Sequence, residues 1–388
     1  MKIAYLGKIE LSDIDLSYLH EAQQLADITY ILEVNPRFMR GPAFSIPCLH
    51  QHSGVFKATD IYPELKRMDG FIDTEKFYVV NTCGRLWQLK SFWTHLLLLL
   101  FLMRRQFDII HLAWPPNVYE FVLYWLRRKM MLTVHDPFPH TSLDTFIVRL
   151  RRKVAFWLVP RLIILNKTQR EDFLSYYHLP SYRVIDSQLS CYNYLETIMP
   201  DNTQAPSEGT YILFAGKISP YKGLDYLLPA MKKVHEQCPD SRLVVAGGGK
   251  YHFDISLYQT LSYIDIRNRF IPDNELVALI ANAAFMVCPY TDATQSGVIM
   301  SAFAFHKPVI ATNVGGLPEM VRDGIEGMIV KERDTEALAS AIITLWQRKD
   351  LIRKFSLQIA QRYEEGELSW KHIAQALYQE MQKFSSSR

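Results

Sequence analysis

Tyr211-Ile-Leu-Phe-Ala-Gly-Lys-Ile-Ser-Pro-Tyr-Lys-Gly223 is the stretch of sequence that decides the fold of the C-terminal half. Its apolar start predicts a buried strand, its middle is a glycine-containing loop, and a helix begins near its last residue. A helix N-terminus that follows a strand offers free backbone N–H groups and a positive dipole end, both of which suit a phosphate group. Lys217 and Lys222 place two cations in the same loop. Two solvated surface lysines are the alternative interpretation of this pair.

Strands and helices continue to alternate beyond this loop. We expect strands at Arg242–Ala246, Ile266–Ile271, Phe285–Cys288 and Pro308–Ala311. We expect helices at Leu276–Ala283, Gly297–Phe305, Glu336–Gln347 and Trp370–Phe384. Apolar strands separated by helices predict a parallel sheet that is covered on both faces.

The N-terminal half shows the same alternation. Expected strands are Lys2–Leu6, Ile28–Leu32, Phe107–Leu112, Lys129–Val134 and Leu162–Leu165, with a helix at Asp15–Leu25. The polar, turn-rich segment Met199–Gly209 is interpreted as the linker between the halves. We therefore expect two doubly wound α/β domains, residues 1–200 and 201–388, with ligands at the carboxyl ends of the strands. The last helix, about residues 370–385, is expected to pack back on the N-terminal domain.

Length and composition fit two folded domains. The chain has 388 residues, of which 49% are hydrophobic and 21% are charged. Its net charge of +3 is too small to suggest a nucleic-acid-binding protein. The five cysteines lack metal-ligand spacing and indicate a reducing compartment, and Lys2–Leu6 does not resemble a secretory signal. Leu96–Met103 is far shorter than a membrane span, and we expect it to form a buried helix against the sheet.

Three further segments lie where expected strands give way to helices. In Ala246-Gly-Gly-Gly-Lys250, Gly247 and Gly248 would let the backbone approach a ligand, although the full dinucleotide fingerprint is missing. The backbone N–H groups of Thr294-Gln-Ser-Gly297 could bind an anion, and an ordinary N-cap at Thr294 or Ser296 is the alternative. Val309-Ile-Ala-Thr-Asn-Val-Gly-Gly-Leu-Pro-Glu319 is a strand followed by a tight turn into a helix.

In their order and spacing, these four segments resemble glycosyltransferase family 4, whose members are retaining enzymes with the GT-B fold. The resemblance covers the C-terminal half from Tyr211 to Gln347 and is most specific from Lys307 to Glu319. The N-terminal half is more weakly similar, through Asp108–His111, Leu132–His140 and Asn166–Glu171. The resemblance implies two Rossmann-like domains that face each other across a cleft, with the donor held by the C-terminal domain.

The resemblance also implies roles for individual residues. Lys217 and Lys222 correspond to the basic pair that grips the donor diphosphate, of which the first is more usually arginine. The Glu-x7-Glu pair of the family falls on Ala293 and Ser301, so this chain is a variant that lacks it. A subgroup of the family carries a Gln-Ser-Gly loop there. The expected donor-binding residues are Gly216, Gly247, Gly248, Thr294, Gln295, Ser296, Gly297 and Ser301.

In the N-terminal half, His135 ends an expected strand and matches the histidine that the family brings to the cleft. This match implies a contact with the donor sugar or the leaving phosphate, so His135 joins Lys217 and Lys222 as a catalytic candidate. A histidine bonded to the backbone at a strand end is the alternative. His111, Trp114 and His140 are candidate acceptor-side residues.

The implied function is metal-independent, retaining transfer of a hexosyl unit from a nucleotide-diphosphate sugar to a glycan or lipid-linked acceptor, in surface polysaccharide or glycolipid assembly. The lysines and the loop N–H groups would stabilise the leaving diphosphate, and no cofactor beyond the nucleotide sugar is implied. A non-catalytic subunit that binds a nucleotide sugar or a glycan is the alternative, because the glutamate pair is absent. A dinucleotide oxidoreductase is disfavoured by the incomplete glycine fingerprint.

A peripheral membrane contact is a further expectation. Arg127–Lys129 and Arg149–Lys153 are basic and are flanked by aromatic residues, a combination that suits an anionic membrane surface. These aromatic residues are Trp125, Phe146, Phe156 and Trp157. Two ordinary amphipathic helices with solvated arginines are the alternative. Membrane docking would suit a lipid-linked acceptor and a cytoplasmic protein at the inner face of a membrane.

Overall fold

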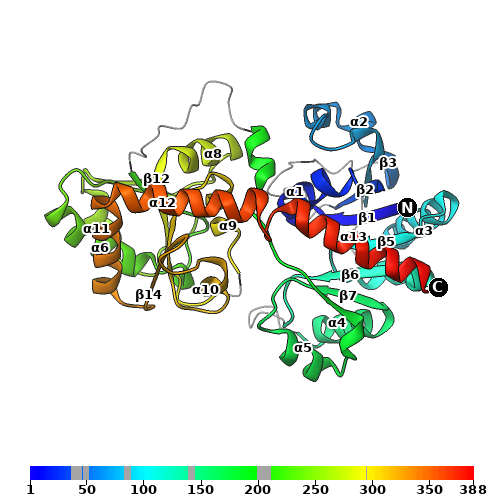
Figure 1. The fold of residues 1–388 in the computed structure, drawn as a ribbon. Helices are drawn as coiled ribbons and strands as arrows, with labels where there is room; N and C mark the ends of the chain where they lie inside the picture. Colours follow the sequence, from blue (N-terminus) through cyan, green and yellow to red (C-terminus); the bar gives the residue numbers. More distant parts are fainter. Residues whose placement is uncertain (36–45, 47–51, 83–88, 139–144, 199–210, 294) are drawn as a thin grey trace. The chain divides into compact units, whose positions relative to one another are not determined.

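The computed structural model describes residues 1–35, 46, 52–82, 89–138, 145–198, 211–293 and 295–388, and the chain forms two compact units (Figure 1). Met1–Leu189 and Trp370–Arg388 make up the N-terminal unit, and Ser190–Ser369 makes up the C-terminal unit. The expected boundary after residue 200 therefore falls inside the C-terminal unit. The expected linker at 199–209 lies outside the described residues.

Within the described residues, the N-terminal unit contains an eight-stranded sheet in the order β3-β4-β2-β1-β5-β6-β7-β8. Its strands are β1 (Lys2–Lys8), β2 (Asp27–Val34), β3 (Gly54–Lys57), β4 (Phe77–Asn81), β5 (Ile109–Leu112), β6 (Met130–Val134), β7 (Arg161–Ile164) and β8 (Val184–Asp186). Neighbouring strands are parallel except β3, which pairs antiparallel with β4. The sequence predicted β1, β2, β5, β6 and β7 but not β3, β4 and β8.

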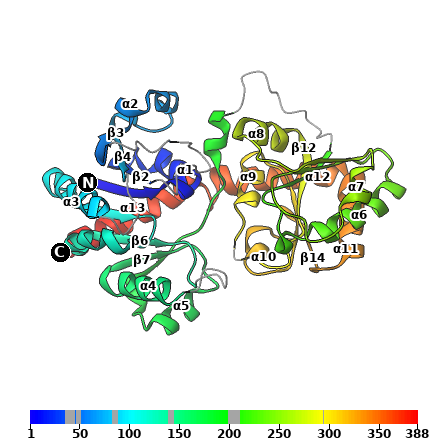
Figure 2. The same cartoon turned by 180° about the vertical axis from the view of Figure 1, so that it is seen from behind.

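Helices cover both faces of this sheet. On one face, Ala4 and Ile110 contact the core formed by α3 (Leu89–Arg105), the 3-10 helix η4 (Val118–Lys129), α4 (Phe146–Leu158) and α5 (Arg170–Tyr177). Tyr5 and His111 alternate with those residues along β1 and β5, so they point to the opposite face. There they meet Tyr18 of α1 (Ser12–Ala22), which in turn contacts Trp370 of α13 (Trp370–Ser386). Figures 1 and 2 show α4 and α5 beside β7, and α13 running along the same unit.

Short elements complete the N-terminal unit. They are η1 (Ile9–Leu11), α2 (Ala58–Ile61), η2 (Pro63–Met68), η3 (Thr74–Lys76) and η5 (Ser181–Arg183).

The leucine-rich helix α3 differs from its prediction. Leu98 and Leu102 are buried against the sheet, as expected. Leu97, Leu100 and Met103, however, are exposed on the other side of the helix. The prediction of a buried helix is therefore wrong for one face, because the helices form a single layer over the sheet. Among the described residues, none of the helices has the length and apolar composition needed to cross a membrane.

The described residues of the C-terminal unit form a six-stranded, fully parallel sheet in the order β11-β10-β9-β12-β13-β14. Its strands are β9 (Tyr211–Ala215), β10 (Leu243–Ala246), β11 (Ile264–Arg267), β12 (Ala283–Cys288), β13 (Val309–Thr312) and β14 (Gly327–Val330). The prediction of two doubly wound α/β domains is thus confirmed, although β11 begins before its expected range and β14 was missed.

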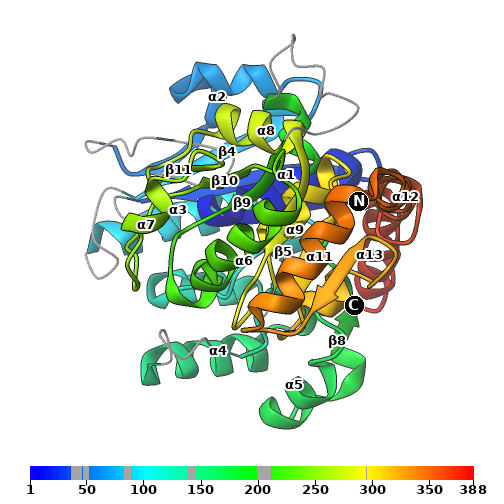
Figure 3. The same ribbon diagram turned by 90° about the vertical axis from the view of Figure 1, so that its left-hand side faces the viewer.

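One face of this sheet packs against α6 (Leu224–Gln237) and α11 (Thr335–Gln347), which lie side by side in Figure 3. The other long helices include α8 (Asp273–Asn282), α9 (Gly297–Ala304) and α12 (Lys349–Ala360). Short elements are η6 (Asn193–Ile198), η7 (Pro220–Lys222), α7 (Ser256–Gln259), α10 (Leu317–Met320) and the π-helical η8 (Gln361–Glu365).

Each sheet has one point where the strand order reverses. In the N-terminal unit this switch point lies between β1 and β5, and in the C-terminal unit it lies between β9 and β12. Loops that leave two such strands diverge to opposite faces of the sheet, so a crevice opens between them at the carboxyl ends. Ligands of doubly wound sheets bind at such points, so the candidate site residues are expected there.

Candidate donor site and acceptor-side residues

The loops after β9 and β12 meet at the switch point of the C-terminal sheet. The backbone N–H of Thr291, after β12, donates a 2.8 Å hydrogen bond to the carbonyl of Tyr221, after β9. Gly223 has a φ of +67° and lies against the second loop, since a Cβ there would fall 1.8 Å from the carbonyl oxygen of Pro289. Only glycine fits this position without moving the backbone. The approach of the two loops therefore depends on Gly223.

Lys222 is half-buried between these loops. Its Nζ lies 3.7 Å from the centre of the Tyr290 ring and 5.1 Å from that of Tyr221. Among the described residues, no carboxylate forms an ion pair with Lys222. Burial lowers its pKa from the ordinary lysine value, and Cys288 opposes the shift. A half-buried ammonium that the protein leaves without a carboxylate is stabilised by an anionic ligand.

Two helix N-termini point to the same place. Gly223 precedes α6 and has no side chain that could cap it. Ser296 precedes α9, and its side chain forms no capping hydrogen bond. The Ser296 hydroxyl instead lies 3.3 Å from the Tyr290 hydroxyl. Gly223 lies against Pro289 and Ser296 against Tyr290, so both helix starts lie at the loop over which Lys222 is placed. This combination suits a diphosphate.

The other candidate donor residues have more local roles. Gly216 (φ +124°) and Gly247 (φ +149°) bring the loops after β9 and β10 together, since a Cβ on Gly247 would lie 1.9 Å from the Gly216 carbonyl oxygen. Gly248 accepts a hydrogen bond from the backbone N–H of Ile218 at 3.1 Å. This loop packing alone accounts for the glycine at Gly247. Lys217 is exposed.

The loop before α9 is described in part. Gln295 is half-buried, Gly297 begins α9, and Thr294 lies outside the described residues. Ser301, in the position of the second family glutamate, donates a 3.0 Å hydrogen bond from its hydroxyl to the carbonyl of Gly297. Its hydroxyl is therefore used within the helix.

In the N-terminal unit, His135 and Trp114 follow β6 and β5 and stack, with ring centres 6.0 Å apart. Burial lowers the pKa of His135 to about 4, so the ring is neutral at pH 7. The backbone of Ala113 accepts a hydrogen bond from the imidazole, while Nε2 is buried and has no partner among the described residues. Nδ1 is therefore the donor, and Nε2 carries a lone pair that can accept a hydrogen bond from a hydroxyl group.

His111 occupies the core, and this placement favours the structural interpretation. It is 2% exposed, and its Nε2 lies 2.8 Å from the Thr133 hydroxyl. Burial, and to a lesser extent His135, lowers the pKa of His111 to about 3. His140, the other candidate acceptor-side histidine, lies outside the described residues.

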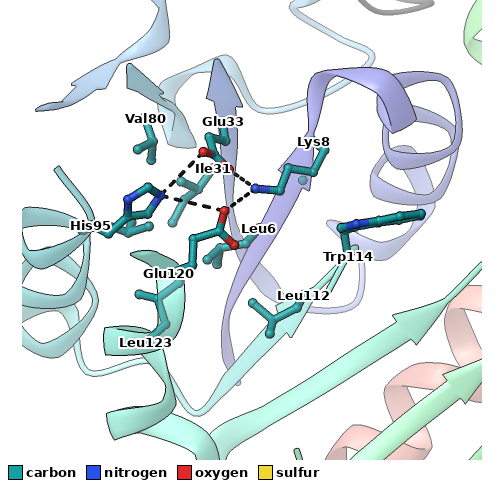
Figure 4. A pocket seen from close by; sticks show the side chains of 12 residues that line it. Leu6, Lys8, Ile31, Glu33, Val80, His95, Leu112, Trp114, Glu120 and Leu123 are labelled. Carbon is teal, nitrogen blue, oxygen red and sulfur yellow. Dashed lines mark hydrogen bonds and ion pairs between the residues drawn. The ribbon is translucent and has the colours of Figure 1, made fainter. Parts of the chain in front are cut away.

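A buried charged cluster that the sequence did not predict fills the pocket at the N-terminal switch point (Figure 4). The ammonium of Lys8 pairs with Glu33 and, at 2.6 Å, with Oε1 of Glu120. Nε2 of His95 lies 3.5 Å from Oε1 of Glu33. Burial would raise the pKa of Glu120, but Lys8 and His95 outweigh it and hold the pKa below its ordinary value. Trp114 lines the same pocket.

The cluster is better explained as an ion-pair network than as a metal site. Ligand atoms of Glu33, His95 and Glu120 lie within 4.8 Å of one another, a spacing that a metal ion could bridge. The Lys8 ammonium already bonds both carboxylates, so a cation would have to displace it. Asp13 and Asp15 stand two positions apart in the sequence, a spacing found in some metal sites, but the Asp15 carboxylate accepts hydrogen bonds from Tyr5 and Tyr30 in the core.

Comparisons with known proteins agree with this architecture. Residues 209–348 match the family described as Glycosyl transferases group 1. The alpha-maltose-1-phosphate synthase of Mycolicibacterium smegmatis is 30% identical over 190 residues, which cover 45% of this chain and 48% of the synthase. The chain thus aligns with about half the length of the curated relatives that it matches.

Two solved structures extend the likeness to both units. Sucrose-phosphate synthase from Thermosynechococcus elongatus has a TM-score of 0.67 at 17% identity and covers 100% of both chains. Anabaena HepE in complex with UDP has a TM-score of 0.69 at 15% identity and covers 99% of this chain and 100% of HepE. These identities are too low to show more than the fold. Residues 209–348 thus match the group 1 glycosyltransferases in sequence, and the two units have the GT-B fold of these solved structures.

Proposed function

We propose that the chain transfers a sugar, with retention, from a nucleotide-diphosphate sugar to a hydroxyl group of a glycan or lipid-linked acceptor. The main support for this proposal is the position of Lys222. Its side chain is half-buried over Tyr290, has no carboxylate partner among the described residues, and lies beside two helix N-termini. A cation at this point is needed by a leaving diphosphate, because negative charge builds on that group during transfer.

The proposed reaction is controlled by charge at the leaving group. The bond between the sugar C1 and the donor phosphate oxygen breaks, and negative charge builds on the diphosphate. Lys222 and the first-turn N–H groups of α6 and α9 stabilise that charge. The acceptor oxygen bonds to C1 on the face that the phosphate leaves, and its proton passes to the departing phosphate oxygen. The lone pair on Nε2 of His135 accepts a hydrogen bond from a sugar hydroxyl.

A uridine diphosphate sugar is the first donor to test. HepE, which has the same fold, has been crystallised with UDP and with UDP-glucose. This support is limited to the fold, so the base is decided by a panel of nucleotides.

The test is a thermal-shift series with UDP, GDP, ADP, CMP and NAD. We expect one nucleoside diphosphate to raise the melting temperature, and Lys222→Ala to weaken its binding about 10- to 100-fold, since a charged hydrogen bond is lost. Lys232→Ala, on the exposed side of α6, is the matched control and should leave binding unchanged. A chain that binds none of the diphosphates, or a Lys222→Ala variant that binds like wild type, would refute the donor site.

The second candidate is a non-catalytic subunit that binds a nucleotide sugar. Ala293 and Ser301 stand where the family carries glutamates, and the Ser301 hydroxyl is bonded within its own helix. Binding of the diphosphate without transfer to any acceptor and without slow hydrolysis of the donor would favour this candidate. A melting-temperature rise with NAD alone would favour an oxidoreductase.

A further inference from the structure

The outer surface of α3, η4 and α4 in the N-terminal unit is unusually apolar. All three elements pack their inner sides on one face of the sheet, so their outer sides form one surface. Trp125 is 77% exposed, Trp157 75% and Phe146 73%. Further exposed apolar side chains on these elements are Trp93, Leu97, Leu100, Met103, Phe121, Ile147, Leu150 and Val154. Soluble proteins seldom leave so many large apolar groups together unless they bind something.

The spacing along the helices shows that this exposure is organised. On α3, Trp93, Leu97 and Leu100 recur at intervals of four and three residues, which places them on one side of the helix. On α4, Leu150, Val154 and Trp157 recur in the same way. The sequence had also placed Phe156 among these aromatic residues, but that prediction is wrong, because Phe156 is 1% exposed and packs in the core.

The same surface carries positive charge almost without negative charge. Lysine and arginine occur ten times in α3, η4 and α4, and Glu120, which is buried, is the only acid in them. Arg104, Arg127, Arg128 and Lys153 are exposed. A second copy of the chain docked on this surface by twofold symmetry would bring like charges together. An anionic lipid surface offers both the opposite charge and an apolar layer.

We infer that α3, η4 and α4 form a membrane-docking surface for an anionic bilayer, which the helices enter in the plane of the head groups. Exposed tryptophan and phenylalanine side chains reach the boundary between head groups and acyl chains, while arginine and lysine bind lipid phosphates. His95 and Glu120 of the pocket at the N-terminal switch point lie on two of these elements. The inference deepens the proposed function and rests on it for its purpose: a lipid-linked acceptor would be presented beside that pocket.

The experiment measures co-sedimentation of the full chain with phosphatidylcholine vesicles that contain about one third phosphatidylglycerol. We expect binding that weakens as salt rises from about 0.1 M to about 0.5 M and that is lost on pure phosphatidylcholine vesicles. The triple variant Arg127→Gln, Arg128→Gln and Lys153→Gln should bind about fivefold more weakly for each charge removed. The double variant Trp125→Ser and Trp157→Ser should lose most binding.

Matched controls are taken from the C-terminal unit. Phe270→Ser with Leu357→Ser removes two equally exposed apolar groups, and Lys232, Lys331 and Lys354 changed to Gln remove three exposed charges. Both control variants should bind vesicles like wild type. Equal loss in the controls, no binding to the anionic vesicles at low salt, or a dimer in light scattering that the tryptophan variant dissociates would each overturn the inference.

The thermal shift with the nucleoside diphosphate separates the two proposals. The surface variants should keep the shift, because Lys222 lies in the other unit. If the wild-type chain binds vesicles but shows no thermal shift with any nucleoside diphosphate, the donor site alone is refuted. An intact shift without vesicle binding would refute the docking surface alone.

Discussion

The two switch points have the same topology but opposite electrostatics. Between β9 and β12, glycine turns and two helix N-termini surround Lys222, for which the described residues supply no carboxylate. Between β1 and β5, the Lys8 ammonium already pairs with two carboxylates of the protein, Glu33 and Glu120. The cation of the first arrangement needs an anion from outside, whereas the cation of the second already has carboxylate partners within the protein.

This difference shows why a phosphate-containing ligand is indicated for the C-terminal unit and not for the N-terminal unit. A phosphate site is recognised by N–H groups and cations that the protein leaves unsatisfied. The N-terminal unit instead offers Trp114, which lines the pocket, and Nε2 of His135, which stacks beside Trp114 and lies outside that lining; these groups suit a sugar ring and a hydroxyl. The comparison predicts that the N-terminal cluster matters for stability and the C-terminal loops matter for binding.

The largest expected effect is on the N-terminal cluster. Lys8→Met leaves two buried carboxylates without their cation, and we expect it to destabilise the N-terminal unit by about 3–5 kcal/mol. Hydrogen exchange should rise in peptides of that unit and not in those of the C-terminal unit. Lys57→Met removes an ion pair with the exposed Glu75 and serves as the control that leaves exchange unchanged. Wild-type exchange in Lys8→Met would show that the cluster does not stabilise the unit.

The next effect concerns the contact between the two donor loops. Gly223→Ala adds a Cβ that is strained at the existing φ of +67° and that clashes with the carbonyl of Pro289. We expect a loss of about 3 kcal/mol in urea unfolding of the C-terminal unit, together with loss of the nucleotide thermal shift. Gly324→Ala is the matched control, since Gly324 has a φ of +71° with no atom within 4 Å of the added Cβ. That control should cost only about 1 kcal/mol, and equal losses in the two variants would assign the whole effect to backbone strain.

Much of the fold could be predicted because apolar strands and helical spacing are local signals. The strands β1, β5, β9 and β12, which define both switch points, all follow from short apolar runs. β14 was missed because Gly327 opens it and it is short, and its pairing with β13 is a tertiary contact.

The donor site was predicted only in outline. The glycine loop and Lys222 follow from the sequence, but the position of Tyr290 beneath the ammonium depends on a contact between residues far apart in the chain. The charged cluster was missed for a similar reason, since Lys8, Glu33, His95 and Glu120 lie on four separate elements and form no motif. Glu33 within an apolar strand and His95 within a run of leucines are the signals that could have identified it.

The smallest effect tests the assignment of His135 as a neutral acceptor. Its pKa is about 4 in the folded chain, whereas histidine in an unfolded chain has a pKa of about 6.5. Between these values the unfolded chain binds a proton that the folded chain excludes, so the contribution of His135 to stability is complete above about pH 6.5 and falls as the pH decreases towards about 4. Asp13 has the opposite effect on stability. Burial raises its pKa to about 7, so as the pH falls the folded chain binds a proton at Asp13 before the unfolded chain does, and this stabilises the folded chain.

The difference between wild type and His135→Gln isolates the histidine from Asp13. We expect the stability of wild type relative to this variant to fall by about 1 kcal/mol between pH 6 and pH 5, measured by urea unfolding. Asp13→Asn should make the acid destabilisation of the chain steeper, because the opposing group is removed. If His135→Gln left the pH dependence unchanged, His135 would titrate alike in the folded and unfolded chains. The ring would then be protonated below about pH 6.5 in the folded chain as well, and in that range Nε2 would donate a hydrogen bond rather than accept one from a sugar hydroxyl.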